Sequence, residues 1–302
     1  MRFLPLFFIL LFTTPPTFAL EIQPVTDGIY ALVGETEQRS ETNLANNATF
    51  GVVVTDDGLI LIDAGGSREG AKKIHDTIRT FSQKPVKYVI NTGGQDHRWL
   101  GNGYWQDLGA QVIASRAAVE DQKERSDLQL SALKQFLGAK LEGTVPSFAN
   151  ITFDESHSLA FGGLEIVIEH PAAAHTPGDS IVWVKSKGTL FSGDIIYVER
   201  ILGVGEQSNS KDWIAAFERI KTLAPKHIIP GHGPATDLKT ATKQTYDYLV
   251  NLRQKIREHL EAGGDMITAP KVDQSDFKYL KQFSSLAGRN AQQVFSEMEW
   301  EE

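Results

Sequence analysis

The chain has 302 residues, of which 41% are hydrophobic and 23% are charged, a balance typical of a globular protein with a sizeable core. Asp and Glu outnumber Lys and Arg by 38 to 30, so the formal net charge is −8 and most of the surface would repel a polyphosphate backbone. We therefore expect no nucleic-acid partner. The absence of cysteine excludes disulfides, thiolate nucleophiles and sulfur-ligated metals, so any metal must be held by histidine and carboxylate.

The first 19 residues have the pattern of a secretory signal peptide. Arg2 precedes an apolar run over residues 3–12, and Thr17 and Ala19 put small residues at the −3 and −1 positions of a cleavage site. The alternative is a buried N-terminal helix or a membrane anchor, but the run is shorter than the roughly 20 residues that span a bilayer. We expect a periplasmic or secreted protein with no membrane span after cleavage.

The first half of the chain alternates short β-branched runs with turn signals. Ser67 is placed to cap a helix whose buried face carries Ile74, Ile78 and Phe81. A polar segment over residues 115–137 also has a helical pattern. The predicted strands of this half span residues 28–33, 50–54, 59–62, 87–90 and 111–114.

A second β-rich half begins near Ile151. Helices are predicted over residues 211–222 and 239–262, the second ending at a Gly-Gly pair. No low-complexity linker separates the halves, so we predict one domain over residues 20–264 and a C-terminal extension over residues 265–302 that packs on it. The predicted strands of this half span residues 164–169, 181–184, 189–191 and 227–229.

Four loops that follow predicted strands concentrate histidine and aspartate. Loops at strand ends can converge on one point without straining the core, and convergence from four strands suits a metal. Each loop also has a simpler interpretation, such as a hydrogen-bonded surface pair or a turn cap. The histidine of the last loop stands between two glycines, which allow close approach of the backbone. The candidate residues are Asp96, His97, His175, Asp194 and His232.

The order Asp-His, His-Thr-Pro-Gly-Asp, Phe-Ser-Gly-Asp and Pro-Gly-His-Gly resembles the metallo-β-lactamase superfamily of hydrolases over about residues 28–264. An aspartate at position 194 resembles the pattern of the glyoxalase II branch and its relatives. True β-lactamases typically carry Cys or Ser at this position. The resemblance implies an α+β fold, an αββα sandwich of two mixed sheets flanked by helices. It also implies a metal pocket at one edge of the sheets, with Asp63 as a supporting residue.

The first metal motif departs from the family pattern. The family has H-x-H-x-D-H after an Asn-Thr pair, whereas here the residues that follow Asn91 and Thr92 are Gly, Gly, Gln, Asp and His. Both leading histidines are missing. If the Asn-Thr pair is held in register, the loop is one residue shorter, and the position of Gln95 relative to the second histidine is left open. By the resemblance, the first metal site keeps only His175.

The resemblance thus implies one metal, with the first site weakened because an amide is a poor zinc ligand. Asp96, His97 and His232 would hold it, and Asp194 would complete the shell or leave a water position. Zinc is the expected ion for a protein loaded outside the cytoplasm. A metal-bound water would then attack an ester, thioester or amide bond of a small molecule. Asp96 and His175 are the candidate catalytic residues, His175 as general base or substrate donor.

A protein of another class is the alternative. A secreted family member that has lost two ligands could bind a small molecule without turnover, as an accessory protein linked to a quinoprotein or sulfur oxidation system. Two further residues near the site each have two possible roles. Arg98 is expected to pair with Asp96 rather than with a substrate anion. His170 is a candidate replacement ligand, with a strand-end surface role as the alternative.

Overall fold

The computed structural model describes residues 20–301, and the predicted signal peptide lies outside them. A seven-stranded sheet takes the strands of the first half in chain order, antiparallel from β1 to β4 and parallel from β4 to β7. The sheet is therefore mixed. Its strands are β1 (Glu21–Thr26), β2 (Ile29–Val33), β3 (Thr49–Val54), β4 (Leu59–Ile62), β5 (Val86–Ile90), β6 (Gln111–Ser115) and β7 (Ile151–Phe153).

The second sheet has five strands in the order β12-β11-β10-β9-β8. Only the β11–β12 pair is parallel, so this sheet is also mixed. Its strands are β8 (Ser156–Phe161), β9 (Leu164–Glu169), β10 (Ile181–Val184), β11 (Thr189–Phe191) and β12 (His227–Ile229).

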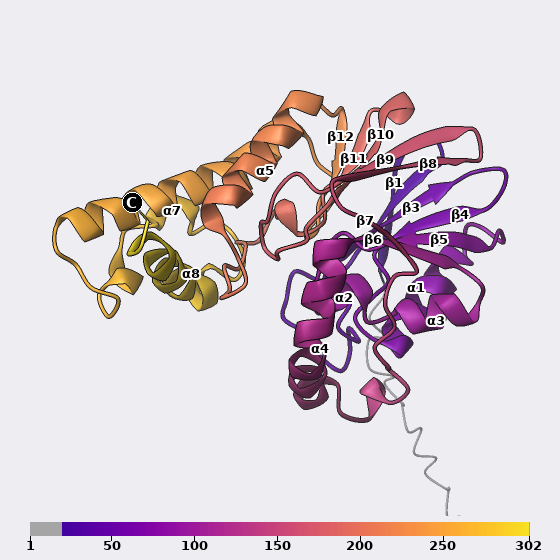
Figure 1. Cartoon of the computed structure of the whole chain (residues 1–302), viewed down its shortest axis with the longest axis horizontal. Coiled ribbons are helices and arrows are strands. Elements are labelled where there is room, and N and C mark those ends of the chain that lie inside the picture. The colour runs from indigo at the N-terminus through magenta and orange to yellow at the C-terminus, as the bar shows by residue number, and fades with distance from the viewer. Residues whose placement is uncertain (1–19, 302) are drawn as a thin grey trace, which may run out of the picture.

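Helices flank both sheets on opposite sides of the molecule (Figure 1). A π-helical turn, Thr242–Tyr246, joins α6 to α7, so the long helix predicted near residue 239 has a local irregularity. Ser67 caps α1 as predicted, accepting a hydrogen bond from the Gly70 amide. The helices are α1 (Arg68–Ile78), α2 (Asp96–Trp99), α3 (Asn102–Asp107), α4 (Arg116–Leu137), α5 (Ser210–Leu223), α6 (Leu238–Ala241), α7 (Asp247–Glu261) and α8 (Phe283–Met298).

Successive side chains of the buried strands pack alternately against the helices and against the other sheet. In β4, Leu59 and Leu61 pack towards α1 and α3, whereas Ile60 and Ile62 pack between the two sheets. Successive side chains of a strand point to opposite faces, so a strand that is apolar at every position is covered on both. The predicted αββα sandwich of two mixed sheets is confirmed.

The strand β1 is absent from the predicted elements. It contains Pro24, which cannot donate a ladder hydrogen bond and so argues against a central strand. The structure places β1 at the edge of the seven-stranded sheet, paired only with β2, where a proline is tolerated. Among residues 20–301, no helix is both long and apolar enough to cross a membrane.

Residues of the C-terminal helix α8 share a hydrophobic cluster with residues of α5 and α7. Val294 and Phe295 of α8 are buried in the same cluster as Leu249 and Leu252 of α7. Asn290, which is 1% exposed, adds a polar link. Its amide donates to the Leu202 carbonyl and to the Tyr248 hydroxyl, and its oxygen accepts from the Val204 amide. The division of the chain after residue 264 stays a prediction.

We expect Asn290→Ala to lower the free energy of unfolding by about 2–3 kcal/mol, because it leaves buried backbone groups without hydrogen-bond partners. Urea denaturation of the variant measures this. Ser284→Ala, at an exposed position on the same helix, is the matched control and should change the free energy by less than about 0.5 kcal/mol. Equal effects of the two substitutions would contradict a specific link through Asn290.

Candidate metal centre

The candidate residues lie on loops that follow strands of both sheets. Asp96 and His97 begin the short helix α2, which comes shortly after β5. Asp194 follows β11, and His232 follows β12. Strand-end placement is confirmed, and it brings residues about 100 positions apart in the sequence to one edge of the sandwich.

Three side chains meet at this edge. The Nε2 atom of His97 lies 3.2 Å from Oδ2 of Asp194, and the Nε2 atom of His232 lies 3.2 Å from Oδ1 of the same carboxylate. One ligand atom from each residue can be chosen so that all three lie within 4.8 Å of one another. All three residues are buried. This group of His97, Asp194 and His232 is the possible metal site of the described chain.

Asp96 is not a member of this group. Arg39 holds its carboxylate with two hydrogen bonds, Nε to Oδ2 at 2.6 Å and Nη2 to Oδ1 at 2.5 Å. Burial would raise the pKa of Asp96, but the Arg39 guanidinium and His97 together hold it well below its usual range. Arg39, in a loop with no periodic pattern, was missed by the sequence analysis. A role of Asp96 as metal ligand or catalytic residue stays a prediction.

The partner predicted for Arg98 is wrong. Arg98 does not pair with Asp96; its Nη2 and Nε atoms donate to the two oxygens of Asp194 at 2.7 and 3.1 Å, and Nη1 donates to Asp63 at 2.8 Å. The side chain is fully buried. The first turn of a helix points successive side chains in different directions, so Asp96 turns to Arg39 while Arg98 turns to the core.

The electrostatics keep two members of the group, Asp194 and His232, in the form that binds metals. Burial would raise the pKa of Asp194, but Arg98 and His97 hold it well below its usual range, so the carboxylate is ionised. Burial also lowers the pKa of His232 well below its usual value, so its imidazole is neutral. Ionised carboxylate and neutral imidazole are the ligand forms that divalent metals require.

His175 lies on another wall of the same pocket and is not in the group of three. Its Nδ1 atom donates to the Gly203 carbonyl at 2.9 Å, which leaves the lone pair on Nε2. Burial lowers the pKa of His175 to about 4, so the ring is neutral at pH 7. The Nδ1 atom of His170 donates instead to the Asp179 carbonyl at 2.7 Å, and His170 does not line the pocket.

The loop that lacks the two histidines is tightly filled. A side-chain carbon on Gly93 would lie 2.2 Å from Oδ1 of Asp179, and one on Gly94 would lie 1.7 Å from Oδ2 of Asp121. Gln122 and Gln129 of α4 donate to the carbonyls of the two glycines at 3.0 and 2.8 Å. Larger side chains at these glycines would therefore displace buried carboxylates, which supports the expectation of a weakened first site.

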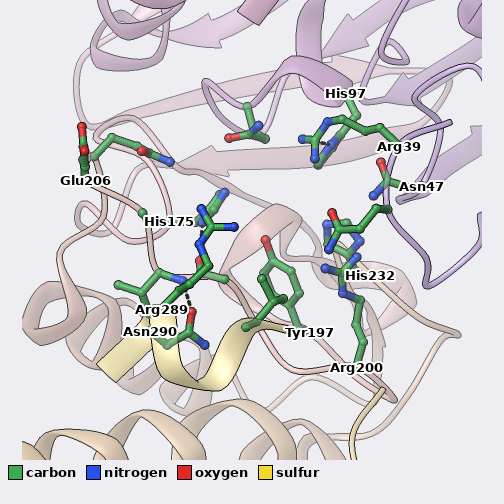
Figure 2. Close-up of a pocket in the computed structure, with 17 residues that line it drawn as sticks. Arg39, Asn47, His97, His175, Tyr197, Arg200, Glu206, His232, Arg289 and Asn290 are labelled. Carbon is green, nitrogen blue, oxygen red and sulfur yellow. Dashed lines mark hydrogen bonds between the residues drawn. The ribbon is translucent and has the colours of Figure 1, made fainter. Parts of the chain in front are cut away.

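The pocket over the group of three has a volume of about 370 Å³. Figure 2 shows His97 and Arg39 above it, His232 and Arg200 on one side, and His175 on the other, with the Tyr197 hydroxyl pointing into the middle. The Tyr197 ring stacks on His232 with a centroid distance of 4.5 Å. Arg289 and Asn290 of α8 and Glu206 complete the rim.

The family model described as the metallo-beta-lactamase superfamily matches residues 45–232. The chain belongs to the metallo-beta-lactamase superfamily. It is 26% identical over 222 residues to a metallo-beta-lactamase type 2 of Elizabethkingia meningoseptica, covering 71% of this chain and 79% of that one. It is 23% identical to metallo-beta-lactamase IND-1 of Chryseobacterium indologenes, covering 64% of this chain and 79% of that one.

Solved structures show the same fold. A metallo-beta-lactamase from Pontibacter korlensis superposes with a TM-score of 0.62 at 21% identity, covering 77% of this chain and 99% of that one. The sec-alkylsulfatase Pisa1 from Pseudomonas sp. superposes with a TM-score of 0.71 at 14% identity, covering 92% of this chain and 50% of that one. The likeness to the alkylsulfatase fold therefore extends beyond the residues that the family model matches.

The superfamily motif fits this structure without a shortened loop. Counted directly from the Asn-Thr pair, H-x-H-x-D-H puts Gly93 and Gln95 at the histidine positions. His97 then takes the position of the motif's aspartate, and Arg98 that of its last histidine. This register agrees with the geometry, because His97 and not Asp96 joins Asp194.

The group of three fits a zinc ion. Two imidazoles and one carboxylate, with further positions free, form a ligand set typical of catalytic zinc sites. Nδ1 of His232 is buried and has no hydrogen-bond partner among residues 20–301, so the contact of Nε2 with Asp194 and the stacked Tyr197 ring orient this imidazole.

The shortened loop makes Asp96 a metal ligand, whereas the unshortened loop puts His97 at the motif's aspartate position. These two alignments predict different zinc contents for two single variants. We expect His97→Ala to lose bound zinc and Asp96→Asn to retain it, because only His97 contributes an atom to the group of three. Zinc per chain, measured by inductively coupled plasma mass spectrometry on both folded variants, decides between them. Loss of zinc in Asp96→Asn with retention in His97→Ala would restore the shortened loop and Asp96 as the ligand.

Proposed function

We propose that this protein is a zinc-dependent hydrolase that cleaves an ester, thioester or amide bond of a small molecule with one zinc ion. The observation that carries the proposal is the convergence of His97, Asp194 and His232 at one point beneath a pocket of about 370 Å³. Membership of the superfamily, whose members are generally hydrolases, supports it. Zinc bound by the three residues would supply Lewis acidity and lower the pKa of a water molecule.

Two side chains of the pocket have the chemistry that the reaction needs. His175 is neutral, and its Nε2 lone pair can accept a proton from the attacking water while Gly203 keeps the ring in place. Burial raises the pKa of Tyr197 well above its usual value, so its hydroxyl stays protonated. That hydroxyl points into the pocket in Figure 2 and can donate a hydrogen bond to negative charge that develops on the substrate.

A binding or accessory protein without turnover is the second candidate. One observation favours it: Arg98 forms an ion pair with Asp194, and Arg39 forms one with Asp96. Under this proposal the same pocket holds a small molecule, and the two arginines balance the carboxylates in place of metal cations.

The hydrolase proposal predicts activity that a chelator abolishes. We expect the zinc-loaded protein to cleave at least one chromogenic ester, thioester or β-lactam, and EDTA or His232→Ala to lower the rate by at least about 100-fold. His157→Ala, on β8 and away from the pocket, is the matched control and should keep the wild-type rate. No cleavage of any substrate class, with or without chelator, would instead favour the binding protein.

We also propose export, because residues 1–19 have the composition of a signal peptide. The expected mature chain begins at Leu20. N-terminal sequencing of the protein recovered from the periplasm or medium measures this, and a chain that retains Arg2 would contradict it.

A further inference from the structure

Arg200 is a buried arginine that has no carboxylate oxygen within 4 Å in the described chain. Its residue is 5% exposed, and its Nε and Nη1 atoms are buried with no hydrogen-bond partner among residues 20–301. The other two buried arginines differ. Arg98 pairs with Asp63 and Asp194, and Arg253 pairs with Glu301. Arg200 is thus the exception among the three.

A guanidinium in this position is costly. An arginine side chain stays protonated at neutral pH, and taking a charge out of water without a nearby counter-charge destabilises the folded chain. The Tyr197 ring, 5.9 Å from the guanidinium carbon, offers only a weak compensating contact. A zinc ion in the neighbouring site cannot serve as partner, because it is also positive. An acceptor that enters the pocket can pair with this guanidinium.

The backbone fixes Arg200 against that pocket. The preceding residue, Glu199, has a left-handed φ of +61°, and its carbonyl accepts a hydrogen bond from the Lys281 amide. The amide of Ile201 donates in turn to the Lys281 carbonyl. Arg200 is therefore held from both sides, and its side chain lines the pocket beside His232 (Figure 2).

The charges around the pocket favour an anion. The protein as a whole has a formal net charge of −8, yet the pocket is lined by Arg39, Arg200 and Arg289 and by one acidic residue, Glu206. Arg39 is paired with Asp96, but Arg289 is exposed and has no carboxylate within 4 Å in the part of the chain that the structure describes. Arg200 and Arg289 lie on opposite sides of Tyr197 in Figure 2.

We propose that the pocket binds a small molecule through an oxyanionic group, a carboxylate or a sulfate, that pairs with the guanidinium of Arg200. The planar fork of an arginine suits either group, since both present two oxygens to two N–H donors. That this molecule is the substrate rests on the proposed hydrolase. The binding of the anion does not, because it involves Arg200 and not the zinc ligands.

Direct binding tests the proposal without catalysis. Glutarate and sodium sulfate are titrated by calorimetry into the full chain, as purified and again after chelation, with glutaramide as the neutral probe. We expect glutarate or sulfate to bind, glutaramide not to bind, and Arg200→Met to weaken binding of the anion by about 10- to 100-fold. Arg200→Lys should retain part of the affinity. Arg257→Met, at an exposed position on α7, is the matched control.

The titrations show whether an anion binds at Arg200 and which kind of anion it is. A response to glutarate alone identifies a carboxylate site, and a response to sulfate alone identifies a sulfate site. Failure of both anions to bind, or equal binding to wild type and Arg200→Met, would overturn the proposal. Thermal unfolding gives a second measurement. Arg200→Met removes an uncompensated buried charge, so we expect an unchanged or higher Tm; a clear fall in Tm would instead indicate a structural role for Arg200.

An activity measurement then connects the anion to the substrate. The zinc-loaded protein is compared on mono-p-nitrophenyl glutarate and p-nitrophenyl valerate, which differ in the terminal carboxylate. We expect kcat/KM to favour the anionic ester by at least about 10-fold, and Arg200→Met to bring this ratio towards one. Anion binding without cleavage of either ester would leave Arg200 as the anion site and reject the hydrolase. Cleavage with no preference for the charged ester would reject Arg200 as a substrate contact.

Discussion

The Arg98 side chain holds together the ends of both sheets and the candidate metal centre. Its guanidinium donates to the Thr49 carbonyl in β3 and to Asp63 after β4 on one side. On the other it donates to Asp194 after β11 and to the Gly231 carbonyl before His232. Breaking a buried ion pair by removing one partner typically costs about 3–5 kcal/mol. The geometry of the metal ligands therefore depends on this one cation.

The same contact limits how strongly the centre attracts a metal. Asp63 and Asp194 contribute two negative charges and Arg98 one positive charge, so these three side chains together carry one net negative charge. Asp96 adds nothing, because Arg39 compensates it. One net negative charge favours the binding of a single divalent ion over the binding of two. The filled loop at Gly93 and the arginine at the motif's last position support the same proposal by independent routes.

Local patterns in the sequence were sufficient to predict most strands and helices, the sandwich and the loops that carry the site. They did not predict the role of a side chain where that role depends on a partner far away in the sequence. Asp96 and His97 are adjacent, and only the position of Arg39, 57 residues earlier, shows which carboxylate is neutralised in place. Arg98 was assigned to its neighbour in sequence, whereas its partners lie 35 and 96 residues away. No local pattern singles out Arg200, because its lack of an ion-pair partner is visible only in three dimensions.

The wall of the pocket depends on residues beyond the region that the superfamily model matches. Lys281 fixes the backbone on both sides of Arg200, and Asn290 of α8 holds Leu202 and Val204 just after it. Gly203 lies between these last two and accepts the hydrogen bond from His175. The C-terminal segment thus positions both Arg200 and the neutral imidazole, while the matched region supplies the candidate metal ligands. A change in the C-terminal segment can therefore alter the pocket wall without any change in the candidate metal ligands.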